Sequence, residues 1–243
     1  MNTPRQYEST VGDELCAKNG RWTFGGEVSR HFDQHVSKSV PLYEEGHNLI
    51  LELSDFFLHK GSHCYDVGCS TGKLALGLAA RHSDKGVRIT AFDTEPDMVT
   101  QASALCSGNQ DIDVLHADLV EASMNNSDMV ICYYTLQFIH PKFRQDVISK
   151  IYRSLNWGGA FILFEKVRAP DARFQDITTQ LYAEFKNQNG YSATEIFAKS
   201  RSLKGILDPF STQANIDFLN RAGFSDVMTI MKYVCFEGML AIK

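Results

Sequence analysis

The sequence has no long apolar run and no cluster of basic residues. No stretch approaches the ~20 apolar residues of a bilayer-spanning helix, and the first residues carry no apolar signal-peptide core. The 24 Lys and Arg residues are outnumbered by 29 Asp and Glu, which gives a net charge of -5. Such a balance offers no basic surface to a nucleic-acid backbone or an anionic membrane. We therefore expect a cytoplasmic protein that contacts neither nucleic acid nor membrane directly.

Cysteine and histidine patterns typical of metal centres are also missing. The six cysteines, at positions 16, 64, 69, 106, 132 and 235, include no CxxC pair and no zinc-finger spacing, which favours reduced thiols. His31 and His35 lie four residues apart on an expected helix, but no third ligand has a suitable spacing. We predict no metal site.

Short apolar runs alternate with stretches of helical period between residues 64 and 166. This alternation predicts βα units on a parallel sheet. The expected strands are residues 64–67, 88–93, 112–115, 129–133 and 160–164, with helices over 72–81, 96–107 and 143–155. The Trp157-Gly158-Gly159 turn is expected to end the last of these helices.

The flanking segments complete one expected domain of residues 1–243. Residues 1–60 form a helical cap with a break at Pro41, and residues 61–168 form the nucleotide-binding core. Residues 169–210 form a helical region for substrate contacts. Residues 211–243 hold a last helix and a hairpin of strands at 226–231 and 234–242.

The motif Asp66-Val-Gly-Cys-Ser-Thr-Gly72 follows the first strand and opens a helix. Its glycines allow the backbone to turn sharply and approach a ligand at the carboxyl edge of the sheet. The spacing is GxSxG, whereas dinucleotide-binding loops have GxGxxG. The carboxylate of Asp66 disfavours a phosphate and suits a cationic ligand, which indicates a charged amine and a sulfonium.

Two further acidic residues end neighbouring βα units. Asp93 is placed to accept hydrogen bonds from both hydroxyls of a ribose. Asp118, with Leu119, is placed to meet the exocyclic amine and the face of an adenine. Each aspartate alone is explained better as a helix cap than as a ligand contact. Because all three stand in register with one glycine loop, together they favour a nucleotide site.

The whole constellation resembles class I S-adenosylmethionine (SAM)-dependent methyltransferases. More specifically, the chain is similar to the carboxy-SAM synthase family from about Trp22 to Lys243. The first loop is shared by many methyltransferases, whereas Ser-Val-Pro-x-Tyr, Thr-Leu-Gln-Phe and Asn-Gly-Tyr-Ser, in this order, are much more specific. The motifs that carry the resemblance are Trp22-Thr-Phe24, Ser39-Val-Pro-x-Tyr43, Gly68-Cys-Ser70, Thr135-Leu-Gln-Phe138, Lys150-Ile-Tyr152, Leu155-Asn156, Glu165-Lys166, Phe185-Lys and Asn189-Gly-Tyr-Ser192.

The resemblance implies an α/β, Rossmann-like class I methyltransferase fold: a seven-stranded, mostly parallel sheet with one antiparallel strand near the C-terminus, plus N-terminal cap helices. It implies a homodimer in which the region around residue 201 lies near the partner subunit. The implied site for SAM, or for carboxy-SAM, comprises Tyr43, Asp66, Gly68, Cys69, Ser70, Asp93, Thr94, Asp118, Leu119 and Tyr133.

The resemblance also implies an unusual reaction. The family moves carbon dioxide from prephenate onto the sulfonium methyl of SAM, giving carboxy-SAM and phenylpyruvate for wobble-uridine modification in transfer RNA. A sulfonium acidifies its own methyl group, so the resulting carbon captures carbon dioxide in a site that excludes water. An arginine then holds the new carboxylate through a charge-assisted, bidentate contact.

This chain departs from the family pattern at two places. Tyr133 stands where the family has asparagine, and the family's carboxylate-binding arginine aligns with Ser200, one residue before Arg201. We expect a local shift that lets Arg201 serve, and we take Arg201, Tyr43 and Tyr133 as the candidate catalytic residues. Lys166 either orients an anionic substrate or is a solvated strand end.

These departures keep other functions open. One alternative is a SAM-dependent methyltransferase acting on a small molecule, or another enzyme that uses the sulfonium in non-methyl chemistry. A further alternative is a non-catalytic binding module, which the presence of all three cofactor-contacting acids disfavours. The main hypothesis is a carboxy-SAM synthase that acts on a small molecule, with prephenate as the implied substrate.

Overall fold

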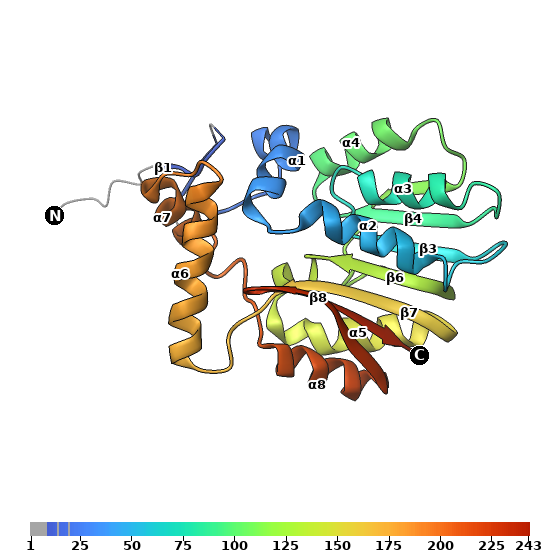
Figure 1. Ribbon diagram of the computed structural model, residues 1–243. Coiled ribbons are helices and arrows are strands. Elements are labelled where there is room, and N and C mark those ends of the chain that lie inside the picture. Colours follow the sequence, from blue (N-terminus) through green and yellow to red (C-terminus); the bar gives the residue numbers. More distant parts are fainter. Residues whose placement is uncertain (1–8, 14, 19) are drawn as a thin grey trace.

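The computed structural model describes residues 9–13, 15–18 and 20–243. Its centre is a seven-stranded sheet in the order β5-β4-β3-β6-β7-β9-β8 (Figure 1). Strands β3 to β7 run parallel, and β9 is antiparallel to both of its neighbours. The predicted mostly parallel sheet with one antiparallel strand is therefore confirmed. The strands are β3 (His63–Val67), β4 (Arg88–Asp93), β5 (Ile112–His116), β6 (Ser127–Tyr133), β7 (Leu155–Lys166), β8 (Asp226–Tyr233) and β9 (Phe236–Ile242).

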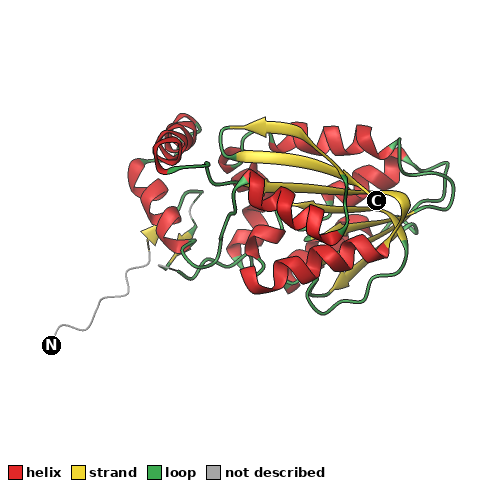
Figure 2. Ribbon diagram, turned by 90° about the horizontal axis from the view of Figure 1, so that it is seen from below, coloured by secondary structure: helices red, strands yellow, loops and turns green. Residues whose placement is uncertain are grey.

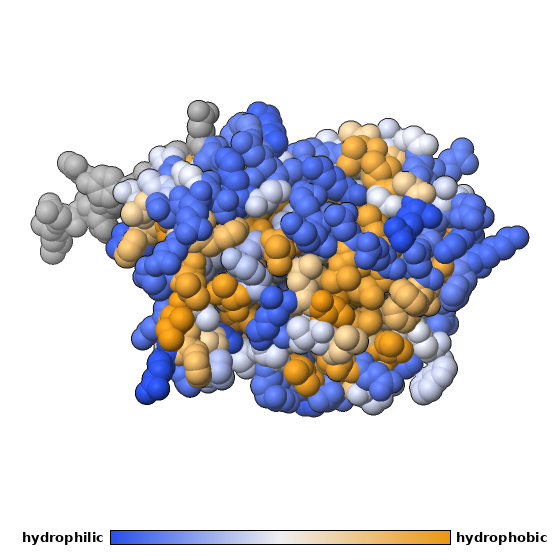
Figure 3. All heavy atoms as spheres, in the orientation of Figure 1, coloured by the Kyte–Doolittle hydropathy of each residue, from blue (hydrophilic) through white to orange (hydrophobic). Residues whose placement is uncertain are grey.

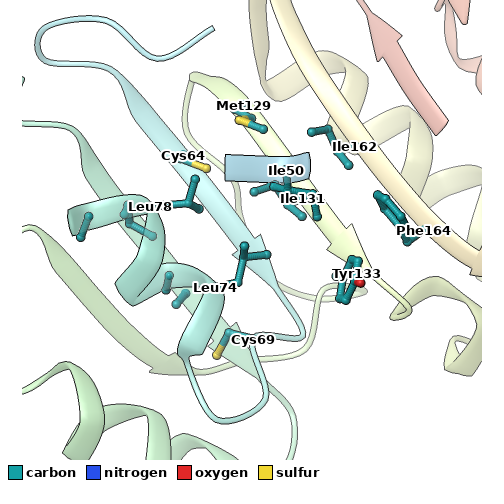
Figure 4. Close-up of a cluster of buried hydrophobic side chains, with 14 of the residues drawn as sticks. Ile50, Cys64, Cys69, Leu74, Leu78, Met129, Ile131, Tyr133, Ile162 and Phe164 are labelled. Atoms are coloured by element: carbon teal, nitrogen blue, oxygen red, sulfur yellow. The ribbon is translucent and has the colours of Figure 1, made fainter. Parts of the chain in front are cut away.

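Helices cover both faces of the sheet, because successive side chains of a strand point to opposite faces. Figure 4 shows one face, where Ile131 and Ile162 of the sheet meet Ile50 and Leu78 of the covering helices. Phe161 belongs to the opposite face, which a second apolar cluster buries. The first face is covered by α2 (Tyr43–Ser54), α3 (Lys73–Arg81) and α4 (Pro96–Cys106), and the second by α5 (Pro141–Ser154) and α8 (Thr212–Ala222).

A cap lies beyond the carboxyl ends of the parallel strands. It contains α1 (Glu27–Ser39), α6 (Ala172–Gln188), α7 (Ala193–Ser202) and a small sheet of β1 (Ser9–Thr10) and β2 (Cys16–Ala17). Figures 1 and 2 both place α6 and α7 beside the end of the large sheet rather than on either of its faces. Trp22 and Val28 belong to a separate apolar cluster in this cap.

Local sequence signals account for most helix boundaries. The break at Pro41 separates α1 from α2, so the two predicted cap helices are confirmed. Asp171 begins α6 by accepting a hydrogen bond from the backbone N–H of Phe174, and Ser192 begins α7 as half of a capping box. Among the helices that the structure describes, none is long and apolar enough to cross a membrane.

The prediction for the Trp157-Gly158-Gly159 turn is wrong. Helix α5 ends at Ser154, and Leu155 is already extended, so the turn lies inside β7 rather than acting as a helix stop. Gly158 has a φ of 77° and donates its N–H to the carbonyl of Lys243. The glycines therefore let β7 begin irregularly and pair with the end of β9, because only a residue without a Cβ adopts that φ at low cost.

Candidate active site

The glycine loop after β3 forms the floor of the site. The N–H groups of Gly68 and Cys69 both donate to the carbonyl of Phe92, at 2.8 and 3.1 Å, which ties the loop to the end of β4. Gly68 has a φ of 71°, and a Cβ there would lie 2.5 Å from Oγ1 of Thr135. A side chain at this position is therefore excluded by backbone conformation and by space.

Asp66 lies at the bottom of this site with only 2% of its surface exposed. Burial, and then the charge of Asp93, raise the pKa of Asp66 to about 7. Its Oδ2 has no hydrogen-bond partner among the residues that the structure describes. A buried acceptor without a donor is unfavourable, and the ammonium group of an amino acid moiety supplies both the donor and the opposite charge. The residue therefore fits the cationic end of SAM.

Asp93 ends β4 beside the same loop. Its Oδ2 accepts the N–H of Ser70 at 3.0 Å, and its Oδ1 accepts the N–H of Glu95 at 3.0 Å. Burial raises its pKa. The backbone of Thr94 also hydrogen-bonds this carboxylate, which leaves about one of its four acceptor positions for a ribose hydroxyl. Thr94 is exposed, and its carbonyl is 2.9 Å from Nε2 of His116.

The loop after β5 carries Asp118 and Leu119. Asp118 is exposed and caps its own turn by accepting the N–H of Val120 at 2.8 Å, whereas Leu119 is buried. The ammonium group of Lys150 on α5 binds the carbonyls of Leu119, Val120 and Ala122. Lys150 thus fixes the backbone that presents these two residues.

A cleft with an empty volume of about 300 Å³ opens above the glycine loop. It brings together six of the ten predicted binding residues, while Asp93, Thr94, Asp118 and Leu119 lie outside its lining. Figure 4 shows Cys69 in the loop and Tyr133 at the end of β6. The lining residues are Asp33, Tyr43, His47, Asp66, Gly68, Cys69, Ser70, Thr71, Lys73, Leu74 and Tyr133.

Asp33 of α1 and His47 of α2 also line this cleft, although neither was predicted from the sequence. Asp33 of α1 accepts a hydrogen bond from Thr71 at 2.9 Å and lies 3.1 Å from the ammonium group of Lys73. His47 stands one helical turn after Tyr43, and burial lowers its pKa to about 4, so its imidazole is neutral. The spacing of Tyr43 and His47 is a signal that the sequence offered, whereas no sequence pattern pairs α1 with the start of α3.

Tyr133 occupies the space between the cleft and α2. Its Oη donates to the carbonyl of Tyr43 at 2.6 Å, and the two ring centroids are 5.0 Å apart. A Cβ on Gly46 would lie 2.2 Å from that Oη. The tyrosine at this position therefore depends on a glycine one turn along α2, and its hydroxyl proton is already committed to the backbone.

Of the three candidate catalytic residues, Arg201 is the one that does not line the cleft. It lies on α7 with an exposed side chain and is absent from the cleft lining. Within one chain, the cleft therefore assembles without it.

The fold and the cleft agree with the known proteins that this chain resembles. A family model described as "Methyltransferase domain" matches residues 65–159. A solved SAM-dependent methyltransferase from Methanosarcina mazei superposes with a TM-score of 0.57 at 16% identity, covering 79% of this chain and 96% of that one. The chain accordingly has the fold of the class I methyltransferases.

Sequence relatives define the family more narrowly. The carboxy-S-adenosyl-L-methionine synthase of Staphylococcus epidermidis is 34% identical over 92% of this chain and 97% of its own length. The enzyme of the same name from Campylobacter lari is 34% identical over 95% of this chain and 99% of its own length. This chain belongs to the carboxy-S-adenosyl-L-methionine synthase family.

Proposed function

We propose that this protein converts SAM and prephenate to carboxy-SAM and phenylpyruvate. Prephenate loses carbon dioxide and hydroxide as its ring becomes aromatic. The methyl group of SAM loses a proton and gains the carbon dioxide, and the proton and the hydroxide leave as water. The carboxy-SAM would serve wobble-uridine modification of transfer RNA, and we place the enzyme in the cytoplasm.

The observation that carries this proposal is the carboxylate oxygen of Asp66, which has no hydrogen-bond partner among the described residues. The second support is that the chain is similar to carboxy-SAM synthases along nearly its whole length. Asp66 would bind the ammonium group of SAM, and Asp93 would bind the ribose. Asp118 and Leu119 would meet the adenine at the adjoining strand end. Tyr43 and Tyr133 would cover the sulfonium with aromatic rings, which attract a cation.

Arg201 would hold the new carboxylate in the cleft of a second copy of the chain. Support comes from the apolar surface near it, which a monomer leaves in water. Phe174, Ile177 and Leu181 share one face of α6 and are 51%, 50% and 46% exposed, and Phe197 of α7 is 71% exposed. Figure 3 shows this apolar surface over α6. We propose that it packs against its copy in a homodimer.

The test of the reaction is the mass of the nucleotide after incubation with SAM and prephenate. We expect it to gain the mass of carbon dioxide while phenylpyruvate appears in equal amount. Arg201→Ala should abolish the product, and the matched control Arg88→Ala, at the opposite edge of the sheet, should not. An unchanged nucleotide mass with wild-type protein would sink the proposal.

Mixed dimers show whether Arg201 serves the cleft of its own chain or the cleft of the partner subunit. Asp66→Asn and Arg201→Ala are each expected to be inactive alone. If the arginine acts across a two-fold interface, mixing equal amounts of the two should restore about a quarter of wild-type activity, because half of the dimers then contain one intact site. No recovery in exchanging dimers would refute an arginine supplied by the partner.

One observation favours a second candidate function. Tyr133 replaces the family's asparagine with a hydroxyl that is bonded to the carbonyl of Tyr43, so the amide expected there is lost. A small-molecule methyltransferase would tolerate this change. It predicts S-adenosylhomocysteine as the product and no carboxylated nucleotide.

A further inference from the structure

Three lysines gather in the cap, outside the residues that line the cleft. Lys166 ends β7, Lys186 lies on α6 and Lys199 lies on α7. The ammonium groups of Lys166 and Lys186 stand over the same ring, that of Tyr182, at 4.3 and 4.4 Å from its centroid. Lys186 interacts electrostatically with Lys166 and with Lys199. Burial lowers the pKa of Lys199 well below its usual value, and its Nζ lies 3.0 Å from Nε2 of His35, so Lys166 and Lys186 are the two cations of this group.

No described carboxylate neutralises Lys166 or Lys186. Among residues 9–13, 15–18 and 20–243, neither ammonium group has a hydrogen bond or an ion pair, and Lys204 adds a further positive charge beside Lys166. The nearby thiol of Cys235 is buried, and burial raises its pKa, so it is neutral. Lys186 is only 8% exposed. A buried, like-charged pair without an anion is unfavourable.

The carboxylates closest to this group are engaged elsewhere. Asp13 accepts hydrogen bonds from Tyr191 and from Lys38 and lies 2.9 Å from Nδ1 of His35. Glu195 caps α7 by accepting the N–H and the hydroxyl of Ser192, at 2.8 and 2.7 Å. These contacts leave the lysine group with an excess of positive charge.

An empty space lies beside the lysines. Its empty volume, about 180 Å³, includes open solvent, and it is lined by Lys186 and Lys199, the hydroxyl residues Ser39 and Tyr191, Glu195, and the apolar Val11 and Ile196. Lys166 and the rings of Tyr182 and Phe236 lie outside this lining. One short segment contributes to both spaces: Ser39 lines this one, and Tyr43, four residues later, lines the cleft. Tyr182 joins the two elements by donating to the carbonyl of Ser39 at 2.9 Å.

We propose that Lys166 and Lys186 bind the carboxylates of the anionic co-substrate, a small dicarboxylic acid with an apolar ring. The paired ammonium groups would supply the charge-assisted hydrogen bonds that two carboxylates require. The rings of Tyr182 and Phe236, whose centroids are 5.1 Å apart, would contact its apolar body. This proposal rests on the proposed function, since it assigns the second substrate of the same reaction.

Steady-state kinetics with Lys166→Met and Lys186→Met tests the assignment, with exposed Lys60→Met on the far side of the sheet as the control. Each site variant should raise KM for prephenate about tenfold to a hundredfold, as expected for a lost charge-assisted bond, and leave the SAM dissociation constant unchanged. Unchanged KM values in both site variants, with an active wild type, would overturn the proposal.

A binding measurement separates this inference from the proposed reaction. Benzylmalonate and 3-phenylpropionate differ by one carboxylate and serve as unreactive probes. Benzylmalonate should raise the melting temperature of wild type more than 3-phenylpropionate does, and Lys186→Met should erase the difference. Equal effects of the two probes on wild type would refute a dicarboxylate site, even where the protein makes carboxy-SAM. A wild type that discriminates between the probes but makes no carboxy-SAM would refute the reaction alone.

A second readout distinguishes binding from packing. If Lys186 served only to pack on Tyr182, its replacement would lower the melting temperature of the unliganded protein. Because the lysines repel one another, we expect Lys186→Met to leave that temperature unchanged or to raise it. A clear fall in melting temperature together with unchanged probe binding would assign Lys186 a structural role.

Discussion

Replacing Asp66 by asparagine should stabilise the unliganded protein and abolish its tight binding of SAM. Asp66 is 2% exposed, its Oδ2 has no partner, and its pKa is raised from 3.8 to about 7. A shift of this size corresponds to about 4 kcal/mol of lost stability once the carboxylate is charged. Since an amide still leaves a polar atom without a partner, we expect Asp66→Asn to recover about 1–3 kcal/mol.

The effect has a definite pH window. Below pH 3.8 the carboxyl group is protonated in both the folded and the unfolded chain, so it costs the fold nothing. As the pH rises from 3.8 to about 7, the unfolded chain ionises first, and the stability of the wild type falls relative to that of the variant. Above pH 7 the difference is constant.

Urea unfolding of the unliganded proteins at about pH 5 and about pH 8 measures this difference. Asp113→Asn, on the exposed side of the edge strand β5, is the matched control and should show no such trend. Calorimetry at about pH 8 should find SAM binding weakened about tenfold to a hundredfold in Asp66→Asn. A variant that is less stable than wild type at the higher pH, or that binds SAM equally well, would refute the reasoning.

Three other substitutions test the framework of the cleft. Gly68→Ala should cost about 2–4 kcal/mol in urea unfolding, because it forces a Cβ to within 2.5 Å of Thr135 at positive φ; Gly108→Ala, with open space around it, should not. Gly46→Ala should destabilise the wild type by about 1–3 kcal/mol, because its Cβ would clash with Oη of Tyr133. In the Tyr133→Asn background the same change should be neutral or stabilising, and additive effects in the double-mutant cycle would contradict the contact between positions 46 and 133. Lys150→Met should weaken SAM binding roughly tenfold without touching the nucleotide, as measured by calorimetry, because three loop carbonyls lose their donor; unchanged affinity would show that the loop is held otherwise.

The centre of the sheet was predictable because β3, β6 and most of β7 are buried on both faces and therefore appear as continuous apolar runs. Residues 88–93 match β4 at both ends, and Asp66 was placed at the edge of the sheet from one acidic residue before a glycine. The start of β7 was not predictable. Its Trp157-Gly158-Gly159 turn resembles a helix stop, and only pairing with Lys243, at the far end of the chain, makes those residues part of a strand.

The helices α1, α6 and α7 fall in segments predicted to be helical, but their contacts were not predicted, for a related reason. Asp33 contacts Thr71 across 38 positions, and Lys186 is brought beside Lys166 only by the docking of α6 on the sheet edge. Local patterns give the period of a helix but not the partner of each face. Lys166 remained ambiguous in the sequence because its significance depends on a second lysine that lies on another element.

The cleft and the lysine group in the cap thus have opposite charges, and residues 39–43 connect the linings of the two spaces. The cleft holds the partnerless carboxylate of Asp66, and the cap holds lysines without anions, with residues 39–43 between them. Binding of a cationic sulfonium compound needs Asp66 ionised, above its pKa of about 7, and binding of a dianion needs Lys186 protonated, below its pKa of about 8. The pH profile of kcat/KM for prephenate should thus be bell-shaped when SAM is kept far below its own KM, so that the profile reports groups of the enzyme without SAM. Lys186→Met should remove the alkaline limb and keep the acid limb; an alkaline limb that persists in this variant would assign it to another group.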